Sequence, residues 1–243
     1  MEFSIGKQTF ELPDLEGETL PHLAFLTAFD AAKSFHTKKD AITGNTHLSD
    51  TGRAAQIAPL IDRLWDQILV STENLEQERS HWNKREDELF AVGSPESSNE
   101  ISRESEIRAW WRNQSADVRL KIMKDVEAGP EHAELVRALL RSPVPDSIDL
   151  EKRHFRELHN QIVRLDNPGE WMAIESGRRA LDWAQRGMGH VVGISYGATG
   201  WDGSAVLRQA LKTGREMAAG VMFDAKEVAM ARNVLSAQRH MTA

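Results

Sequence analysis

The chain has 243 residues, with 37 acidic and 30 basic side chains and a formal net charge of −7 at pH 7. Hydrophobic residues make up 40 % and charged residues 28 %, which is typical of a folded soluble chain. The absence of cysteine excludes a disulfide scaffold, thiolate metal sites and a cysteine nucleophile. No stretch approaches the roughly 18 uninterrupted apolar residues of a membrane span, and we expect no secretory signal peptide at the N-terminus.

The charge is unevenly distributed. Residues 1–150 carry 27 acidic and 17 basic side chains, a net of −10, whereas residues 151–243 carry 10 and 13, a net of +3. Such a difference in net charge usually reflects solvated helix faces. The alternative is that the acidic region of one subunit attracts the basic region of a neighbouring subunit. A net of +3 is far from the strongly basic patch of a dedicated nucleic-acid binder, so nucleic acid is not the expected partner.

Residues 3–12 predict a short β-hairpin. Phe3 and Ile5 are two residues apart and so face the same side of a strand; Gly6-Lys7 interrupts this alternation, which resumes at Phe10 and Leu12. Glycine supplies the positive φ that a tight hairpin turn needs. An isolated hairpin is marginal in water, so this one must dock on another surface.

Two helices follow in the prediction. The first begins at Thr19 as N-cap and runs to about Phe35. The second runs from about Ser49 to Phe90, with Pro59 near its start as a kink or restart point. One heptad position of this helix is apolar throughout, whereas the second core position of the heptad is apolar at the start of the helix and polar later. This pattern predicts either packing in the chain's own bundle or a narrower contact with another subunit. The seven-residue series is Ile61, Ile68, Leu75, Trp82, Leu89.

The polar segment 93–100 is the predicted linker. It separates a hairpin and long-helix region at 1–92 from a helical domain at 101–243. Six of the sixteen glycines fall between 187 and 203, which predicts an irregular Gly-rich loop there.

Short helices fill the rest of the predicted C-terminal domain. One ends near Glu127, and a later one is capped by Ser147 after the turn Pro143-Val144-Pro145. The last two, at about 204–219 and 224–239, open at Ser204 and Asp224. The predicted fold class is therefore mainly α, a multi-helix bundle with one long helix and a short N-terminal β-hairpin.

Two sequence patterns resemble catalytic motifs, but the residues around each differ from those that the motif requires. Residues 193–197 match G-x-S-x-G around Ser195, and Asp224 and His240 follow in triad order, but the surrounding chain predicts no strand–turn–helix. Ile174-Glu175-Ser176 with the segment 195–200 resembles lytic transglycosylases, which implies Glu175 as a general acid. Trp201-Asp202 stands where that family has Met-Gln.

Metal and cofactor signatures are missing from the sequence. His154 and His159 are five residues apart, which does not stack them on one helical face, and no H-E-x-x-H or phosphate-binding glycine motif occurs. We predict no catalytic residue, no metal and no cofactor.

Tryptophan is frequent, with seven residues in the chain. Trp110 and Trp111 are adjacent on a predicted helix and point about 100° apart, so one ring faces the core while the other meets a second surface. Intramolecular burial is the simpler interpretation, and tryptophan is also a typical interface anchor. We predict an interface from the heptad series and this pair, namely Ile61, Ile68, Leu75, Trp82, Leu89, Trp110, Trp111.

Two segments resemble tailed-phage proteins. Residues 3–15 resemble the hairpin openings of small phage assembly proteins, and residues 118–145 resemble a paired-helix segment of proteins encoded among virion genes. Together they cover about 40 of the 243 residues. The resemblance implies a virion or assembly component, found in the virion or the host cytoplasm, with no catalytic residue to transfer.

The sequence thus predicts a non-enzymatic structural or assembly protein that forms homo-oligomers or docks on other virion proteins. Two alternatives remain. One is a peptidoglycan-cleaving enzyme that uses Glu175. The other is an adaptor whose mildly basic C-terminal half binds nucleic acid or an acidic partner.

Overall fold

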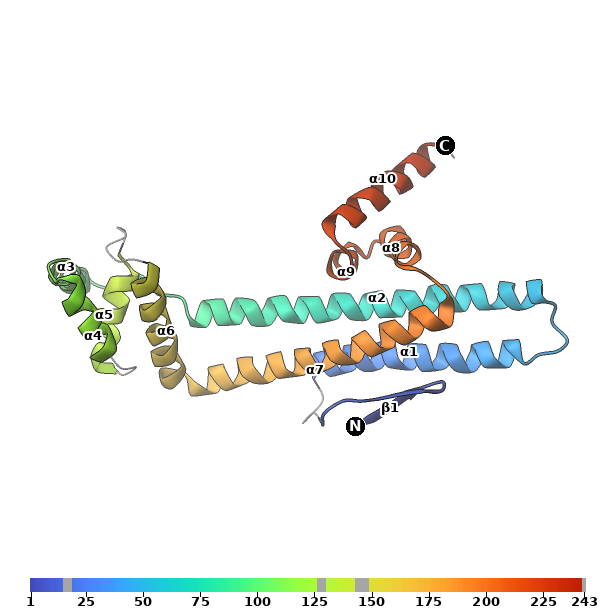
Figure 1. Ribbon diagram of the computed structural model, residues 1–243, viewed down its shortest axis with the longest axis horizontal. Coiled ribbons are helices and arrows are strands. Elements are labelled where there is room, and N and C mark those ends of the chain that lie inside the picture. The colour runs from blue at the N-terminus through green and yellow to red at the C-terminus, as the bar shows by residue number, and fades with distance from the viewer. Residues whose placement is uncertain (15–18, 126–129, 143–148, 242–243) are drawn as a thin grey trace. The chain divides into compact units, whose positions relative to one another are not determined.

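The computed structural model describes residues 1–14, 19–125, 130–142 and 149–241, and it confirms a mainly α fold with an N-terminal β-hairpin and a long helix (Figure 1). The elements are β1 (Glu2–Ile5), β2 (Gln8–Glu11), α1 (Leu20–Thr43), α2 (Asp50–Leu89), α3 (Ser98–Arg112), α4 (Ala116–Asp125), α5 (Pro130–Leu140), α6 (Asp149–Asp166), α7 (Pro168–Thr199), α8 (Gly203–Lys212), α9 (Glu216–Met222) and α10 (Ala225–Met241). No helix in the described ranges has an apolar stretch long enough to cross a lipid bilayer.

The chain divides into two compact units. Unit 1 combines Met1–Trp82 with Ser176–Ala243, and unit 2 is Asn83–Glu175. This differs from the predicted division into 1–92 and 101–243 around a linker. The reason is that the later part of α7 packs into one core with α1 and α2, so the two ends of the chain fold together.

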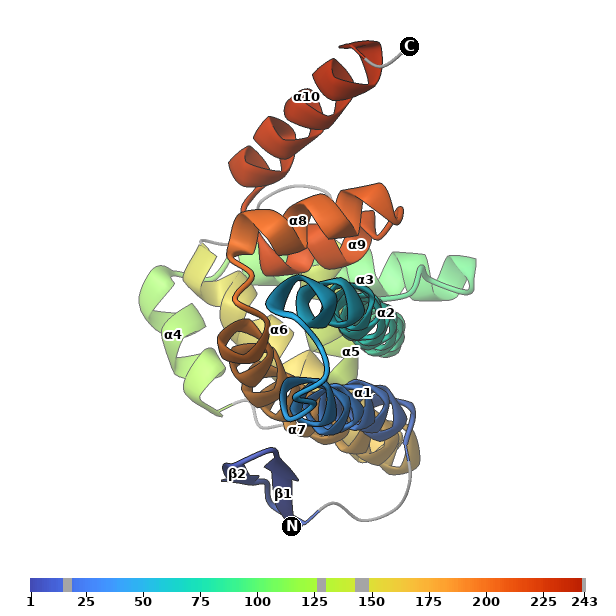
Figure 2. The same ribbon diagram turned by 90° about the vertical axis from the view of Figure 1, so that its right-hand side faces the viewer.

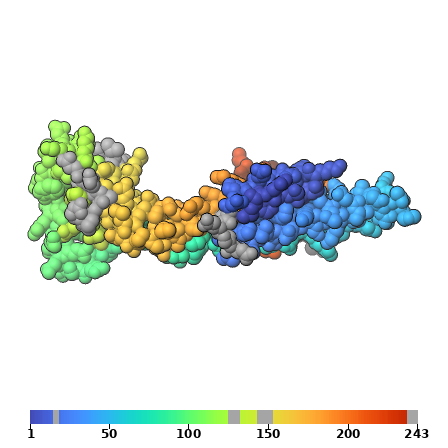
Figure 3. All heavy atoms as spheres, turned by 90° about the horizontal axis from the view of Figure 1, so that it is seen from below, coloured from blue at the N-terminus to red at the C-terminus, as the bar shows by residue number. Residues whose placement is uncertain are grey.

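The hairpin has the predicted register and turn. Phe3 pairs with Phe10, and Gly6 takes a φ of +60° in the turn. The hairpin docks on α1, as its small size requires: the Phe3 ring lies 5.0 Å from Phe25 and 5.2 Å from Phe29, both edge to face. Figure 3 shows the hairpin lying over the surface of α1.

Helix α1 starts where the sequence predicts and ends later. The Thr19 hydroxyl accepts a hydrogen bond from the His22 backbone N–H at 3.3 Å. The helix continues past the predicted end at Phe35 to Thr43, and in this added part the Lys39 ammonium donates to the Ala198 carbonyl of α7 at 2.5 Å.

Helix α2 is the long helix that the sequence predicts. It extends over 40 residues, and Pro59 lies inside it without interrupting it. Its buried face carries Leu64, Trp65 and Ile68, which join the core of unit 1 together with residues of α1, α7 and α8.

The prediction of a Gly-rich loop at 187–203 is wrong. Helix α7 continues through the glycines to Thr199, because Val191 and Ile194 bury one face of it in the core. At Gly187 the missing side chain leaves room for the Phe25 ring. The helix stops only at Gly200, whose φ is +68°.

The first of the two predicted C-terminal helices is divided and begins at a different cap, whereas the second begins where predicted. Asp202 rather than Ser204 caps α8, by accepting from the Ala205 N–H at 2.8 Å. The single helix predicted over 204–219 is divided into α8 and α9, with Gly214 at a φ of +74° between them. Asp224 opens α10 as predicted, in a reciprocal capping box with Glu227. Figure 2 shows α8, α9 and α10 in succession.

Unit 2 contains α3 to α6 with the adjoining ends of α2 and α7. Helix α3 begins inside the predicted linker 93–100, because Ser97 caps it by accepting from the Glu100 N–H at 3.2 Å. Helix α6 ends at Asp166 and α7 begins at Pro168. The predicted end at Glu127, the turn at 143–145 and the Ser147 cap lie outside the described residues. The core of unit 2 is Trp111, Met123, Ala133, Val136, Leu139, Phe155, Leu158, Ile162.

Candidate interaction surfaces

Most of the predicted interface residues face the chain's own interior. Ile68 and Leu75 are buried in the core of unit 1, and Ile61 and Trp82 pack against it. Leu89 is half-buried in unit 2. The heptad series therefore follows the intramolecular packing of α2, which was the simpler of the two predicted uses.

The tryptophan pair diverges as the sequence predicts. Trp111 is fully buried and meets the Phe155 ring edge to face at 5.3 Å, whereas Trp110 is 46 % exposed. Of the seven predicted interface residues, Trp110 alone has an exposed side chain. Trp111 anchors the core of unit 2 and leaves Trp110 as the outward-facing member.

The G-x-S-x-G segment does not form a nucleophile elbow. Ser195 lies within α7, is 1 % exposed, and its hydroxyl has no hydrogen-bond partner in the described part of the chain. A nucleophile elbow requires a strand-to-helix turn that exposes the hydroxyl. Asp224 caps α10 instead of orienting a histidine, and the side chain of His240 lies outside the described residues.

The segments that resemble lytic transglycosylases lie on a single helix. Glu175 is exposed on α7, so it lacks the enclosed apolar surround in which a glycosidase general acid lies. Ser176 and Ser195 are nineteen residues apart on α7, which is about 28 Å along the axis at 1.5 Å per residue. Residues 195–199 are helical and form no loop beside Ser176.

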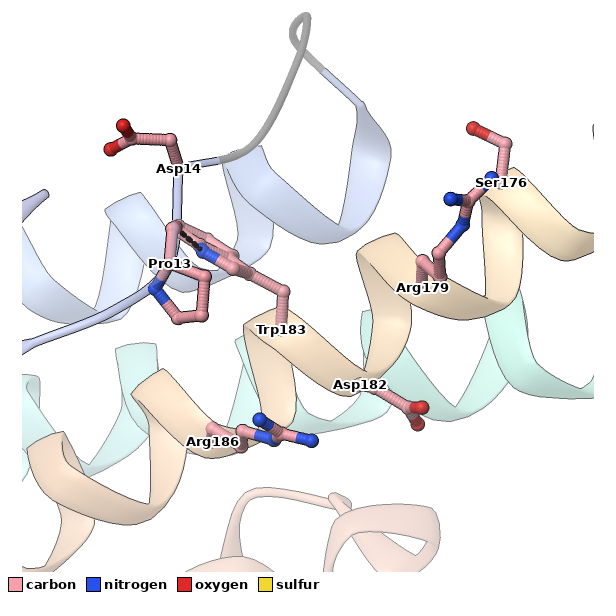
Figure 4. Close-up of a pocket in the computed structure, with 7 residues that line it drawn as sticks. All are labelled: Pro13, Asp14, Ser176, Arg179, Asp182, Trp183 and Arg186. Atoms are coloured by element: carbon pink, nitrogen blue, oxygen red, sulfur yellow. Dashed lines mark hydrogen bonds between the residues drawn. The ribbon is translucent and has the colours of Figure 1, made fainter.

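A cavity of about 470 Å³ opens between the end of the hairpin segment and α7 (Figure 4). The Trp183 indole N–H donates to the Pro13 carbonyl at 2.6 Å and fixes the hairpin segment to the helix. The exposed guanidinium groups of Arg179 and Arg186 line the cavity one above the other along α7. The lining residues are Pro13, Asp14, Ser176, Arg179, Asp182, Trp183, Arg186.

An apolar groove lies between α8 and α10 in unit 1. Met230 is 69 % exposed and Val234 is 51 % exposed along it, while Leu207 forms part of its buried floor. The groove has a volume of about 450 Å³. Its lining residues are Asp202, Gly203, Ser204, Leu207, Arg208, Phe223, Glu227, Met230, Ala231, Val234.

Sequence reasoning missed this groove, although α10 carried a signal for it. Val228 faces the core, so one apolar face of α10 is accounted for. Met230 and Val234 are four residues apart and form a second apolar row on the same helix. Helix α10 thus has more apolar residues than one buried face can hold, and this excess indicates an exposed contact surface.

Unit 2 holds a buried ion network between α3 and α5. The Glu104 carboxylate is almost completely buried, accepts from Arg141, and pairs with Arg108 at 3.2 Å. Arg141 also pairs with Glu100 at 2.9 Å. The pKa of Glu100 lies below its ordinary value because the Glu96 backbone N–H and the Arg141 guanidinium donate to its carboxylate. No pattern in the sequence predicts this network.

Comparison of the chain with protein-family models, with curated proteins and with solved structures found no match.

Proposed function

We propose that this protein is a non-enzymatic assembly protein that acts by binding other chains, including copies of itself. The observation that carries the proposal is the groove between α8 and α10, where Met230 and Val234 expose apolar surface side by side with the floor residue Leu207. Single exposed apolar side chains are ordinary, whereas two that lie side by side along a groove with a buried apolar floor mark a candidate protein contact site.

The exposed Trp110 in unit 2 supports the same role. Tryptophan is enriched among the residues that dominate binding energy at protein interfaces. Other large apolar side chains exposed in unit 2 include Ile101, Val118 and Leu120. These residues offer contact area at a second place in the chain.

The places of the candidate catalytic residues favour a binding role over catalysis. Ser195 is buried inside a helix, and Glu175 is exposed on one. We further propose, from the likeness of residues 3–15 and 118–145 to phage proteins, that the partners are other proteins of a phage particle.

Sedimentation velocity of the purified chain at micromolar concentrations tests the proposal. We expect self-association, or co-sedimentation with assembled particles, that Met230→Glu weakens about tenfold because a buried unpaired charge costs more than ~1.4 kcal/mol. Leu165→Glu is the matched control, since Leu165 is 67 % exposed and is not among the residues that line the groove. A strictly monomeric chain that binds no particle would contradict the proposal.

The enzyme alternative has its own test. Zymography on peptidoglycan compares the wild type with Glu175→Gln, which removes the carboxyl proton that a general acid donates. We expect no clearing by either protein. Clearing by the wild type that Glu175→Gln abolishes would establish the enzymatic function in place of the proposed one.

A further inference from the structure

His159 is an unusual side chain in unit 2. It lies on α6, is 6 % exposed, and forms a backbone hydrogen bond at Phe90. Its Nε2 atom is buried and has no hydrogen-bond partner among the described residues. A buried polar atom without a partner is uncommon in a folded protein and calls for an explanation, such as a bound molecule.

A crevice of about 520 Å³ adjoins this imidazole. It lies between the end of α2, the end of α5 and α6, where Phe90, Leu140 and His159 line it. A neighbouring cavity of about 500 Å³ shares Leu140 and Arg156 with the crevice and is also lined by Arg153. Arg153, Arg156 and His159 are spaced three residues apart, so they lie along one side of α6.

The charges around the imidazole are predominantly positive. Burial lowers the pKa of His159, and the guanidinium groups of Arg137, Arg141 and Arg156 lower it further. Arg141 is paired with carboxylates of α3, whereas Arg153 and Arg156 form no ion pair with another described residue. On the α2 side, Glu86 and Asp87 line the crevice, but neither is among the charges that shift the imidazole.

We propose that this crevice binds an oxyanion, the phosphate group of a small molecule, between the Arg156 guanidinium and Nε2 of His159. Arginine presents paired N–H donors that match phosphate oxygens. A bound anion offsets the positive field, so the imidazole takes up a proton from solution and Nε2 then donates to the anion. Arg153 lies at the adjoining cavity and adds a second cation to the site.

The proposed site couples anion binding to protonation. Because the anion stabilises the imidazolium form, affinity for it rises as the pH falls toward the ordinary range of histidine. The charged groups that face the site are Arg137 from α5, Arg141 directly after α5, Arg153 and Arg156 from α6, and Glu86 and Asp87 from α2.

The test is a titration of the full chain with inorganic phosphate, followed by the imidazole nitrogen resonances in NMR at constant ionic strength. We expect a saturable change at His159 with affinity several-fold higher at about pH 6 than at about pH 7.5. Inorganic sulfate, whose charge is constant over this range, is expected to show the same trend. Arg156→Gln should weaken binding about tenfold, since a charge-assisted pair is worth roughly 1.5–3 kcal/mol.

Two further variants make the outcome decisive. Arg63→Gln removes an exposed arginine of unit 1 and is expected to leave phosphate binding unchanged. His159→Gln keeps an N–H donor without a titrating ring, so its binding of sulfate should show no dependence on pH. Three results would overturn the proposal: no saturable response at His159, an equal response in Arg156→Gln, or an unchanged pH dependence of sulfate binding in His159→Gln.

Discussion

Two glycines of α7 offer a matched test of what the glycines do in this helix. Gly193 is exposed, and a Cβ atom added to it would meet nothing within 4 Å. A Cβ atom added to Gly187 would lie 2.5 Å from Cε2 of Phe25 and 3.0 Å from Cδ1 of Leu12. The two substitutions Gly193→Ala and Gly187→Ala thus make the same chemical change in the same helix, with different neighbours.

The expected magnitudes follow from these contacts. Alanine is favoured over glycine in a helix interior by about 1 kcal/mol, so Gly193→Ala should raise the free energy of unfolding by about that amount. Gly187→Ala gains the same propensity but displaces Phe25, which is fully buried and packed edge to face on Phe3. Overpacking a core costs typically about 1–3 kcal/mol, so the net change should be a loss of up to about 2 kcal/mol.

Thermal unfolding followed by far-UV circular dichroism measures both changes. For a chain of this length, 1 kcal/mol shifts Tm by roughly 2–4 °C, so Gly193→Ala should raise Tm by about that much and Gly187→Ala should lower it. Gly189→Ala is a second substitution with an open surround and should match Gly193→Ala. A fall in Tm for Gly193→Ala, or equal shifts for both glycines, would refute the reasoning.

The buried network, the α1 cap and the buried histidine give three further predictions. Glu104→Ala leaves Arg108 without its carboxylate and Arg141 with Glu100 as its remaining partner, and should lower the free energy of unfolding by about 3–5 kcal/mol in urea titrations, whereas Glu134→Ala, which breaks an exposed ion pair with Arg103, should cost under about 1 kcal/mol. Thr19→Ala should cost about 1 kcal/mol in the same assay, and Thr19→Ser should restore it. Because the folded pKa of His159 is lowered, unfolding in phosphate-free buffer should become easier as pH falls below about 6.5, and a variant with glutamine there should lose that part of the pH dependence.

Local interactions explain why parts of the fold could be predicted from sequence. The hairpin depends on the positive φ at Gly6 and on the alternation that pairs Phe3 with Phe10. The start of α1 depends on the Thr19 hydroxyl three residues from the N–H that it caps. The length of α2 follows from its apolar repeat, and each of these signals acts within a few residues along the chain.

The glycines after 187 show where local reasoning fails. Their low helix propensity predicts a loop, but burial of Val191 and Ile194 against other helices outweighs a cost of about 1 kcal/mol per glycine. The spacing of these two residues is three positions, which fits a helix, yet their burial depends on α1 and α2, far away in sequence. Propensity therefore predicted the wrong structure because the deciding contacts are distant.

The candidate sites, like the fold, depend partly on local sequence and partly on contacts between distant parts of the chain. Composition and the Trp110-Trp111 spacing determined that one ring of the pair faces outward. Only the tertiary structure decided that the heptad residue Ile68 packs inside the chain, that Met230 and Val234 line an open groove, and that His159 lies buried beside a crevice. Sequence by itself determined which residues share a helix face; which faces are covered depends on helices brought together from distant parts of the chain, because burial is a property of the packed structure.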